Sequence, residues 1–130
     1  MKIAELKLLA FGPFTDQTLD LSAGEEGLHV IHGPNEAGKS STLRAIRDLL
    51  FGIPARTEDN FVHNNSQLRL GGCLVSRRGD LIRFVRRKGN KGTLLDAEGK
   101  KAIGDDALDP FLEGVDRGRF EELFGIDYDR

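Results

Sequence analysis

The sequence has little of what marks a secreted or membrane-spanning protein. Its 130 residues include a single cysteine, Cys73, so an internal disulfide is excluded. No apolar stretch approaches the length that crosses a bilayer, and no signal peptide opens the chain. Tryptophan is absent, and hydrophobic residues make up 38%, enough for one core. We therefore expect a cytoplasmic protein with no membrane partner.

A large excess of charge is also lacking, since the formal net charge is −2. The charges are unevenly placed, however. Residues 69–91 hold eight basic residues and one acid, whereas residues 105–130 hold nine acids and three arginines. The basic stretch is a candidate DNA surface, and a solvated strand edge or pairing with the acidic segment is the alternative. Its candidate residues are Arg77, Arg78, Arg83, Arg86, Arg87, Lys88 and Lys91. On a regular strand Arg83 and Arg87 share a face, and Arg86 points the other way.

The segment Gly33–Ser40 (GPNEAGKS) matches G-x-x-x-x-G-K-[ST], the phosphate-binding P-loop. An apolar run at 28–31 precedes it and is predicted to be a buried strand. Residues 41–50 follow it and are predicted to form a helix. This strand–loop–helix setting is the one the motif requires.

The chemistry of the motif follows from its residue types. Glycines let the backbone curve so that N–H groups point at phosphate oxygens, and the helix N-terminus adds its positive dipole end. Lys39 reaches the β- and γ-phosphates and is the candidate catalytic residue, while the Ser40 hydroxyl ligates Mg²⁺. The predicted nucleotide-binding residues are Gly33, Pro34, Asn35, Glu36, Ala37, Gly38, Lys39, Ser40 and Ser41.

Periodicity and turn signals organise the rest of the chain. Strands are predicted at 2–10 and 18–21, and three further runs at 68–76, 81–87 and 93–96 predict an antiparallel meander. Short helices are expected at 109–112 and 117–124. In the helix that follows the P-loop, Leu43, Ile46 and Leu50 form one buried stripe, and Arg44, Arg47 and Asp48 lie off it.

The polar stretch 56–66 has no period and is predicted to be a loop. The chain accordingly divides into strands, P-loop and helix (1–54), the loop (55–66), the meander (67–104) and short terminal helices (105–130). His63 lies in the loop, and whether it approaches the nucleotide stays open. No histidine pair has metal-ligand spacing.

Several blocks together resemble a known family. They include the run from Leu8 to Ser41, Leu49–Pro54 (LLFGIP), Phe84–Gly89 (FVRRKG) and Phe120–Asp127 (FEELFGID). These blocks look like the amino-terminal ATPase lobe of the YhaN-like proteins, which belong with the SMC, RecF and SbcC type of ABC ATPase. The resemblance covers nearly the whole chain.

The resemblance implies an α/β P-loop NTPase fold, namely the amino-terminal lobe of an ABC-ATPase head with an antiparallel β-meander subdomain. It implies ATP and Mg²⁺ as cofactors, and a parent protein that acts in DNA repair or chromosome maintenance through ATP-driven dimerisation of heads. The implied partners are the carboxy-terminal lobe, a second head, DNA and a nuclease or phosphodiesterase subunit. Residues 105–130 would lead toward a coiled coil.

Two catalytic elements of that family are missing from the sequence. There is no run of four apolar residues followed by Asp-Glu, and there is no signature Ser-Gly-Gly segment. In the family both lie in a second lobe. The chain is therefore expected to be an incomplete head that does not hydrolyse ATP unaided.

Two other classes of function stay open. A stand-alone GTPase needs an Asn-Lys-x-Asp guanine reader, and Asn90–Thr93 (NKGT) lacks the Asp. A small-molecule kinase needs a lid and an acceptor site, and neither is found. The other class is a non-enzymatic, nucleotide-gated scaffold. Turnover by the purified chain separates these readings, because the split-head interpretation predicts none.

Overall fold

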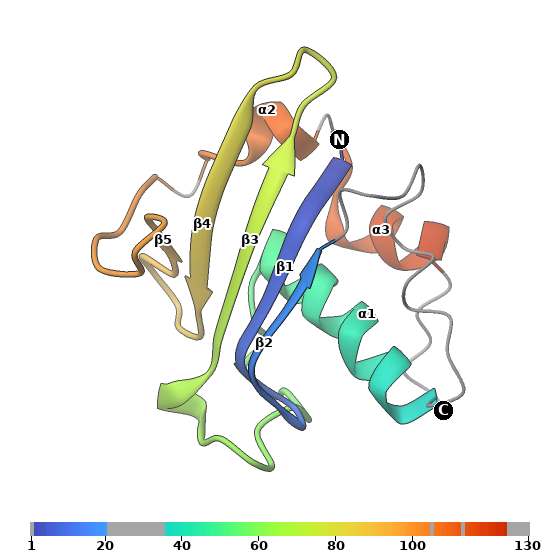
Figure 1. Ribbon diagram of the computed structural model, residues 1–130, viewed down its shortest axis with the longest axis vertical. Helices are drawn as coiled ribbons and strands as arrows, with labels where there is room; N and C mark the ends of the chain where they lie inside the picture. Colours follow the sequence, from blue (N-terminus) through green and yellow to red (C-terminus); the bar gives the residue numbers. More distant parts are fainter. Residues whose placement is uncertain (1, 21–35, 105, 113, 125–130) are drawn as a thin grey trace.

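The computed structural model describes residues 2–20, 36–104, 106–112 and 114–124 (Figure 1). Within them, a five-stranded antiparallel sheet has the strand order β2 (Phe14–Asp20), β1 (Lys2–Phe11), β3 (Arg69–Val75), β4 (Leu81–Arg87) and β5 (Leu94–Leu95). Helix α1 (Glu36–Phe51) packs against the central strands, and α3 (Arg117–Phe124) lies beside α1 (Figure 1). The helices and the sheet thus form two layers around one core.

The sheet begins with a hairpin of β1 (Lys2–Phe11) and β2 (Phe14–Asp20). Gly12 takes a φ of +54° in the connecting turn, a conformation that glycine adopts without strain. The strand expected at the start of the chain is confirmed. The second strand begins earlier than Thr18, because its first half is an exposed polar edge without the apolar alternation that reveals a strand in sequence.

The three predicted meander strands are confirmed as β3 (Arg69–Val75), β4 (Leu81–Arg87) and β5 (Leu94–Leu95). β3 also pairs with β1, with Leu6 opposite Gly72. The meander and the N-terminal hairpin therefore share a single sheet, in which β1 occupies an interior position.

Helix α1 spans Glu36–Phe51 and supplies the other side of the core. It approaches β3 so closely that a Cβ placed at Gly72 would lie 2.5 Å from Leu49 Cδ2. A side chain at this position would force the end of the Leu49 side chain to shift. The most deeply buried apolar residues around it include Leu6, Leu8, Phe11, Ala45, Ile46, Leu49, Leu68, Leu70, Leu74, Phe84 and Phe120.

The two short terminal helices are confirmed as α2 (Asp109–Leu112) and α3 (Arg117–Phe124). Phe120 of α3 is buried and meets Phe51 of α1 edge to face, with ring centroids 5.9 Å apart. The aromatic pair therefore packs α3 against the end of α1.

The loop before β3 also contains one 3₁₀ turn, Asn65–Gln67, which the sequence does not reveal.

Candidate functional site

The P-loop lies at the start of α1. Gly33, Pro34 and Asn35, and the strand predicted at 28–31, fall outside the described residues. Glu36–Ser40 form the beginning of α1, so the helix starts earlier than the residue at which we predicted it. The side chains of Lys39 and Ser40 are not among those described. Their roles stay predictions.

Ser41 is the first residue after the motif whose side chain is described, and it is 5% exposed. Its Oγ accepts a hydrogen bond from Arg44 Nη2 at 3.2 Å. Thr42 is buried to a similar degree. The predicted nucleotide ligand Ser41 is thus already held by a side chain one helical turn further along.

Arg44 itself is held by a buried carboxylate from the loop after α1. Asp59, which is 1% exposed, accepts from Arg44 Nη2 at 2.8 Å and from Arg44 Nε at 2.9 Å. Glu58 Oε1 lies 3.2 Å from the same Nε. The hydrogen bond with Asp59 raises the pKa of Arg44. This two-pronged geometry is the strong form of an Arg–carboxylate pair.

The backbone of Asp59 ties the same loop to the β1–β2 turn. Gly12 N donates to Asp59 O at 2.8 Å, and Asp59 N donates to Thr57 Oγ1 at 3.1 Å. A Cβ placed at Gly12 would lie 3.2 Å from Asp59 Oδ1 and 3.7 Å from Ser41 Oγ. The turn, the loop and the second turn of α1 therefore meet at one point.

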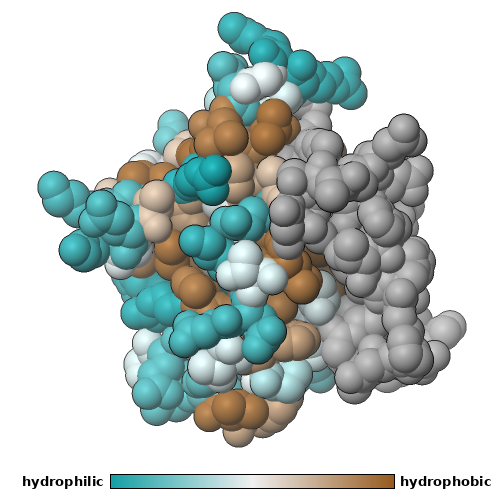
Figure 2. Space-filling model, in the orientation of Figure 1, coloured by the Kyte–Doolittle hydropathy of each residue, from teal (hydrophilic) through white to brown (hydrophobic). Residues whose placement is uncertain are grey.

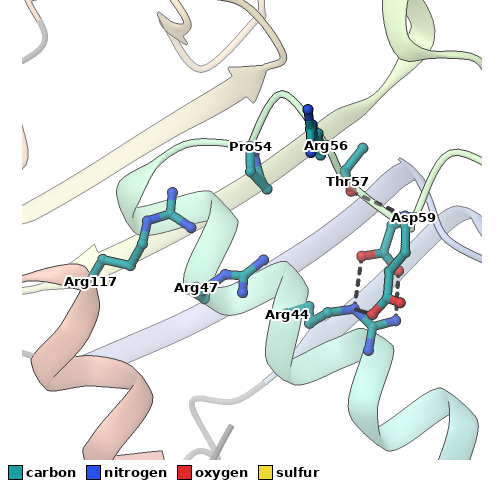
Figure 3. A pocket seen from close by; sticks show the side chains of 8 residues that line it. Arg44, Arg47, Pro54, Arg56, Thr57, Asp59 and Arg117 are labelled. Carbon is teal, nitrogen blue, oxygen red and sulfur yellow. Dashed lines mark hydrogen bonds and ion pairs between the residues drawn. The ribbon is translucent and has the colours of Figure 1, made fainter. Parts of the chain in front are cut away.

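A pocket of about 340 Å³ runs along α1 from this point (Figure 3). Its lining residues are Arg44, Arg47, Pro54, Arg56, Thr57, Glu58, Asp59 and Arg117. Figure 3 shows Arg44 and Arg47 projecting from α1 and Arg117 reaching toward it from α3. Arg117 Nη2 donates to Gly52 O, which holds α3 against the end of α1. Sequence periodicity alone treats Arg47 as an off-stripe position, whereas the structure buries it under this loop and α3.

Asp48 is fully buried beside the pocket. Its Oδ1 accepts from Arg47 Nε at 2.7 Å and lies 3.6 Å from Arg117 Nη1. Its Oδ2 has no hydrogen-bond partner within the part of the chain that the structure describes. Burial raises the pKa of Asp48 to about 6, although the hydrogen bond from Arg47 and the charge of Arg117 act in the opposite direction. Desolvation thus outweighs the ion pairs at this position.

Arg86, one of the candidate DNA contacts, caps the C-terminal end of α1. Arg86 is 7% exposed, and its Nε and Nη2 donate to Leu49 O and Leu50 O, each at 3.1 Å. Its Nη1 donates to Thr93 Oγ1 at 3.0 Å. The side chain therefore faces the helix, as strand parity predicts, and does not belong to an exposed basic surface.

The other basic candidates lie around the opposite face of the sheet and its turns. The Arg83 side chain is 57% exposed, and its Nη1 lies 3.7 Å from Glu5 Oε1. Arg87 instead donates to the carbonyls of Lys88, Lys91 and Gly92 and shapes the turn after β4. Arg77 and Arg78 are exposed in the turn after β3, which projects at the top of Figure 2 as hydrophilic surface. The exposed cations are therefore spread over two turns and one strand.

His63 is held at the start of β2. Its Nε2 lies 2.8 Å from Thr15 Oγ1 and 3.1 Å from Phe14 O, so the ring binds the start of β2. Among the described residues there is no group of three or more His, Cys, Asp or Glu side chains that could hold a metal ion. No helix in this part of the chain is long and apolar enough to cross a membrane.

The P-loop motif leads into helix α1, and α1 packs against the sheet. This arrangement is typical of P-loop NTPases. A family model described as an AAA domain matches residues 1–130, and the chain belongs to that family. Membership implies a P-loop NTPase fold.

Two curated proteins are similar to the chain over nearly all of its length. The chain is 28% identical over 131 residues to the uncharacterized protein YhaN of Bacillus subtilis (strain 168), an alignment covering 98% of this chain and 13% of that protein. It is 29% identical over 142 residues to the SbcC component of the nuclease SbcCD of Deinococcus radiodurans, covering 99% of this chain and 15% of that protein. No solved structure gives a significant match. The resemblance to YhaN-like and SbcC-like ATPases is thereby confirmed, and the chain spans about one seventh of these relatives' length.

Proposed function

We propose that this chain is the ATP-binding, amino-terminal lobe of an SMC-like or SbcC-like ATPase head. The observation that carries the proposal is the sequence GPNEAGKS running into helix α1. The helix N-terminus and the loop amides would bind the phosphates, Lys39 would neutralise the β- and γ-phosphates, and Ser40 would hold Mg²⁺. Bound Mg²⁺ would supply neutralisation of the charge on the phosphates.

Hydrolysis is assigned to a complete head. The sequence has no run of four apolar residues followed by Asp-Glu, the pattern that would hold the metal and orient water. We propose that a carboxy-terminal lobe and a second head supply those groups, and that ATP joins two such heads. The parent protein would then act in the cytoplasm in DNA repair or chromosome maintenance, within a nuclease assembly like the one named for the SbcC relative.

Titration of ATP and Mg²⁺ into the 130-residue chain tests the proposal. We expect micromolar or modestly weaker binding, and Lys39→Ala should weaken it at least ~10-fold because a charge-assisted contact to phosphate is removed. Ser40→Ala should weaken binding in Mg²⁺ far more than in EDTA, since its hydroxyl is assigned to the metal. Equal binding by wild type and Lys39→Ala would contradict the proposal. Rapid ATP turnover by the chain alone would favour the stand-alone enzyme.

The exposed cations of the sheet support a second proposal, contact with the DNA backbone. Arg86 is left out because it is buried, and the turn after β3 carries two exposed arginines. The double variant Arg77→Gln with Arg78→Gln should bind duplex DNA more weakly and lower the slope of log affinity against log salt by about two. The matched control is Lys100→Gln with Lys101→Gln, which removes the same charge from another exposed turn. If both pairs change the slope equally, the contact is not localised at this turn.

A further inference from the structure

The start of α1 is fixed by a residue that lies outside the P-loop motif. Asp59 comes after the helix in sequence, yet its carboxylate lies beside the second turn of α1. It is 1% exposed, and both of its oxygens accept from Arg44. A buried carboxylate with two charge-assisted hydrogen bonds is held in one geometry.

Arg44 links the fixed carboxylate of Asp59 to the helical turn that follows the P-loop. Its Nη2 donates both to Asp59 Oδ1 at 2.8 Å and to Ser41 Oγ at 3.2 Å. Ser41 directly follows Ser40, and the two belong to the same helical turn. The position of the Asp59 carboxylate is therefore coupled through one guanidinium to the backbone that presents Ser40.

The loop that carries Asp59 is also bound to the β1–β2 turn, so the position of Asp59 is fixed from a second side. Gly12 N donates to Asp59 O, and there is little space between Gly12, Asp59 and Ser41 for another side chain. The pocket along α1 begins at this contact (Figure 3). The contact thus joins the β1–β2 turn, the loop and α1 into one unit near the nucleotide end of the helix.

We propose that Asp59, acting through Arg44, is a positioning residue for the P-loop helix. It sets the orientation of the first turns of α1, and thereby the affinity for nucleotide. The effect on nucleotide rests on the proposed function, whereas the effect on the helix start does not. Loss of a residue that orients a metal ligand typically lowers metal affinity or activity about 10- to 100-fold.

The test compares the two ends of the same helix in the 130-residue chain. Asp59→Asn is nearly isosteric but loses the negative charge, and Arg44→Lys keeps the positive charge but loses the two-pronged contact. Arg86→Lys is the matched control, because it weakens a buried arginine contact at the far end of α1. Amide hydrogen exchange is measured without nucleotide, and ATP affinity is measured in Mg²⁺.

We expect Asp59→Asn and Arg44→Lys to speed exchange at residues 37–42 and to weaken ATP binding about tenfold. The double variant should be no worse than Arg44→Lys alone, since Asp59→Asn removes a contact that Arg44→Lys already breaks. Arg86→Lys should speed exchange at residues 49–52 and leave ATP affinity unchanged. Equal losses of ATP affinity in Asp59→Asn and Arg86→Lys, at matched thermal stability, would overturn the positioning role.

The exchange measurement separates this inference from the proposed function. If wild type binds no ATP, the proposed function fails, and faster exchange confined to residues 37–42 in Asp59→Asn still supports the positioning of the helix. Unchanged exchange there in both Asp59→Asn and Arg44→Lys overturns the inference whatever the nucleotide result.

Discussion

Replacing Arg86 by methionine is expected to destabilise the chain by about 3 kcal/mol, because the last carbonyls of α1 lose their buried donors. Leu49 O and Leu50 O both accept from this side chain in a site with 7% exposure. The positive charge also lies at the negative end of the helix dipole. Methionine keeps much of the apolar stem, so the loss reports the hydrogen bonds and the charge rather than a cavity.

Urea unfolding with circular dichroism measures this loss. Arg83→Met is the control, since Arg83 is on the same strand but on the opposite, exposed face of the sheet. It should change the free energy of unfolding by less than about 0.5 kcal/mol. Similar effects of the two substitutions would show that the hydrogen bonds from Arg86 to the end of α1 add nothing to the free energy of unfolding beyond ordinary strand packing.

Asp48→Asn is expected to stabilise the chain at pH 8 by about 3 kcal/mol and to have little effect near pH 4. Burial raises the pKa of Asp48 from 3.8 to about 6, so the folded state binds its proton more tightly than the unfolded state. The stabilising contribution of the protonated carboxyl is therefore fully present below about pH 4 and is lost as the pH rises through about 6. Asparagine keeps a neutral group at all these pH values.

Thermal unfolding from pH 4 to pH 8 checks the sign and the size of this effect. Asp80→Asn is the control, because Asp80 is exposed in the turn between β3 and β4 and carries a carboxylate of the same type. Its difference from wild type should stay near zero. If Asp48→Asn is less stable than wild type at pH 8, the charges of Arg47 and Arg117 outweigh the cost of burying the carboxylate.

The regular elements could largely be predicted because their signals are local. Alternation and glycine-bearing turns locate β3, β4 and β5, and Asp109-Pro110 marks the start of α2. β2 was predicted too short, because an exposed edge strand has no apolar alternation to reveal it. The pairing of β1 with β3 has no local signal, since it joins segments separated by the whole P-loop helix.

The candidate site divides in the same way. The P-loop is a contiguous motif, so the sequence alone names its residues, and their roles stay predictions. The pocket and the Asp59–Arg44 contact bring together α1, the following loop and α3, which no spacing rule connects. One sequence signal was available: Arg47 and Asp48 are charged residues between buried helix positions, a pattern that indicates a charged contact with another element.

The interior place of β1 has a consequence for how the chain folds during synthesis. β1 is made before both of its neighbours, and one of them, β3, follows only after α1 and the loop that follows α1 have been made. Until β3 has been made, the first hairpin lacks the strand that pairs with β1. Completing the sheet therefore needs contacts between segments distant in sequence, and such contacts slow folding. A chain released before β3 is complete would leave α1 with only the β1–β2 hairpin to pack against, and such a product is a natural substrate for chaperones and proteases.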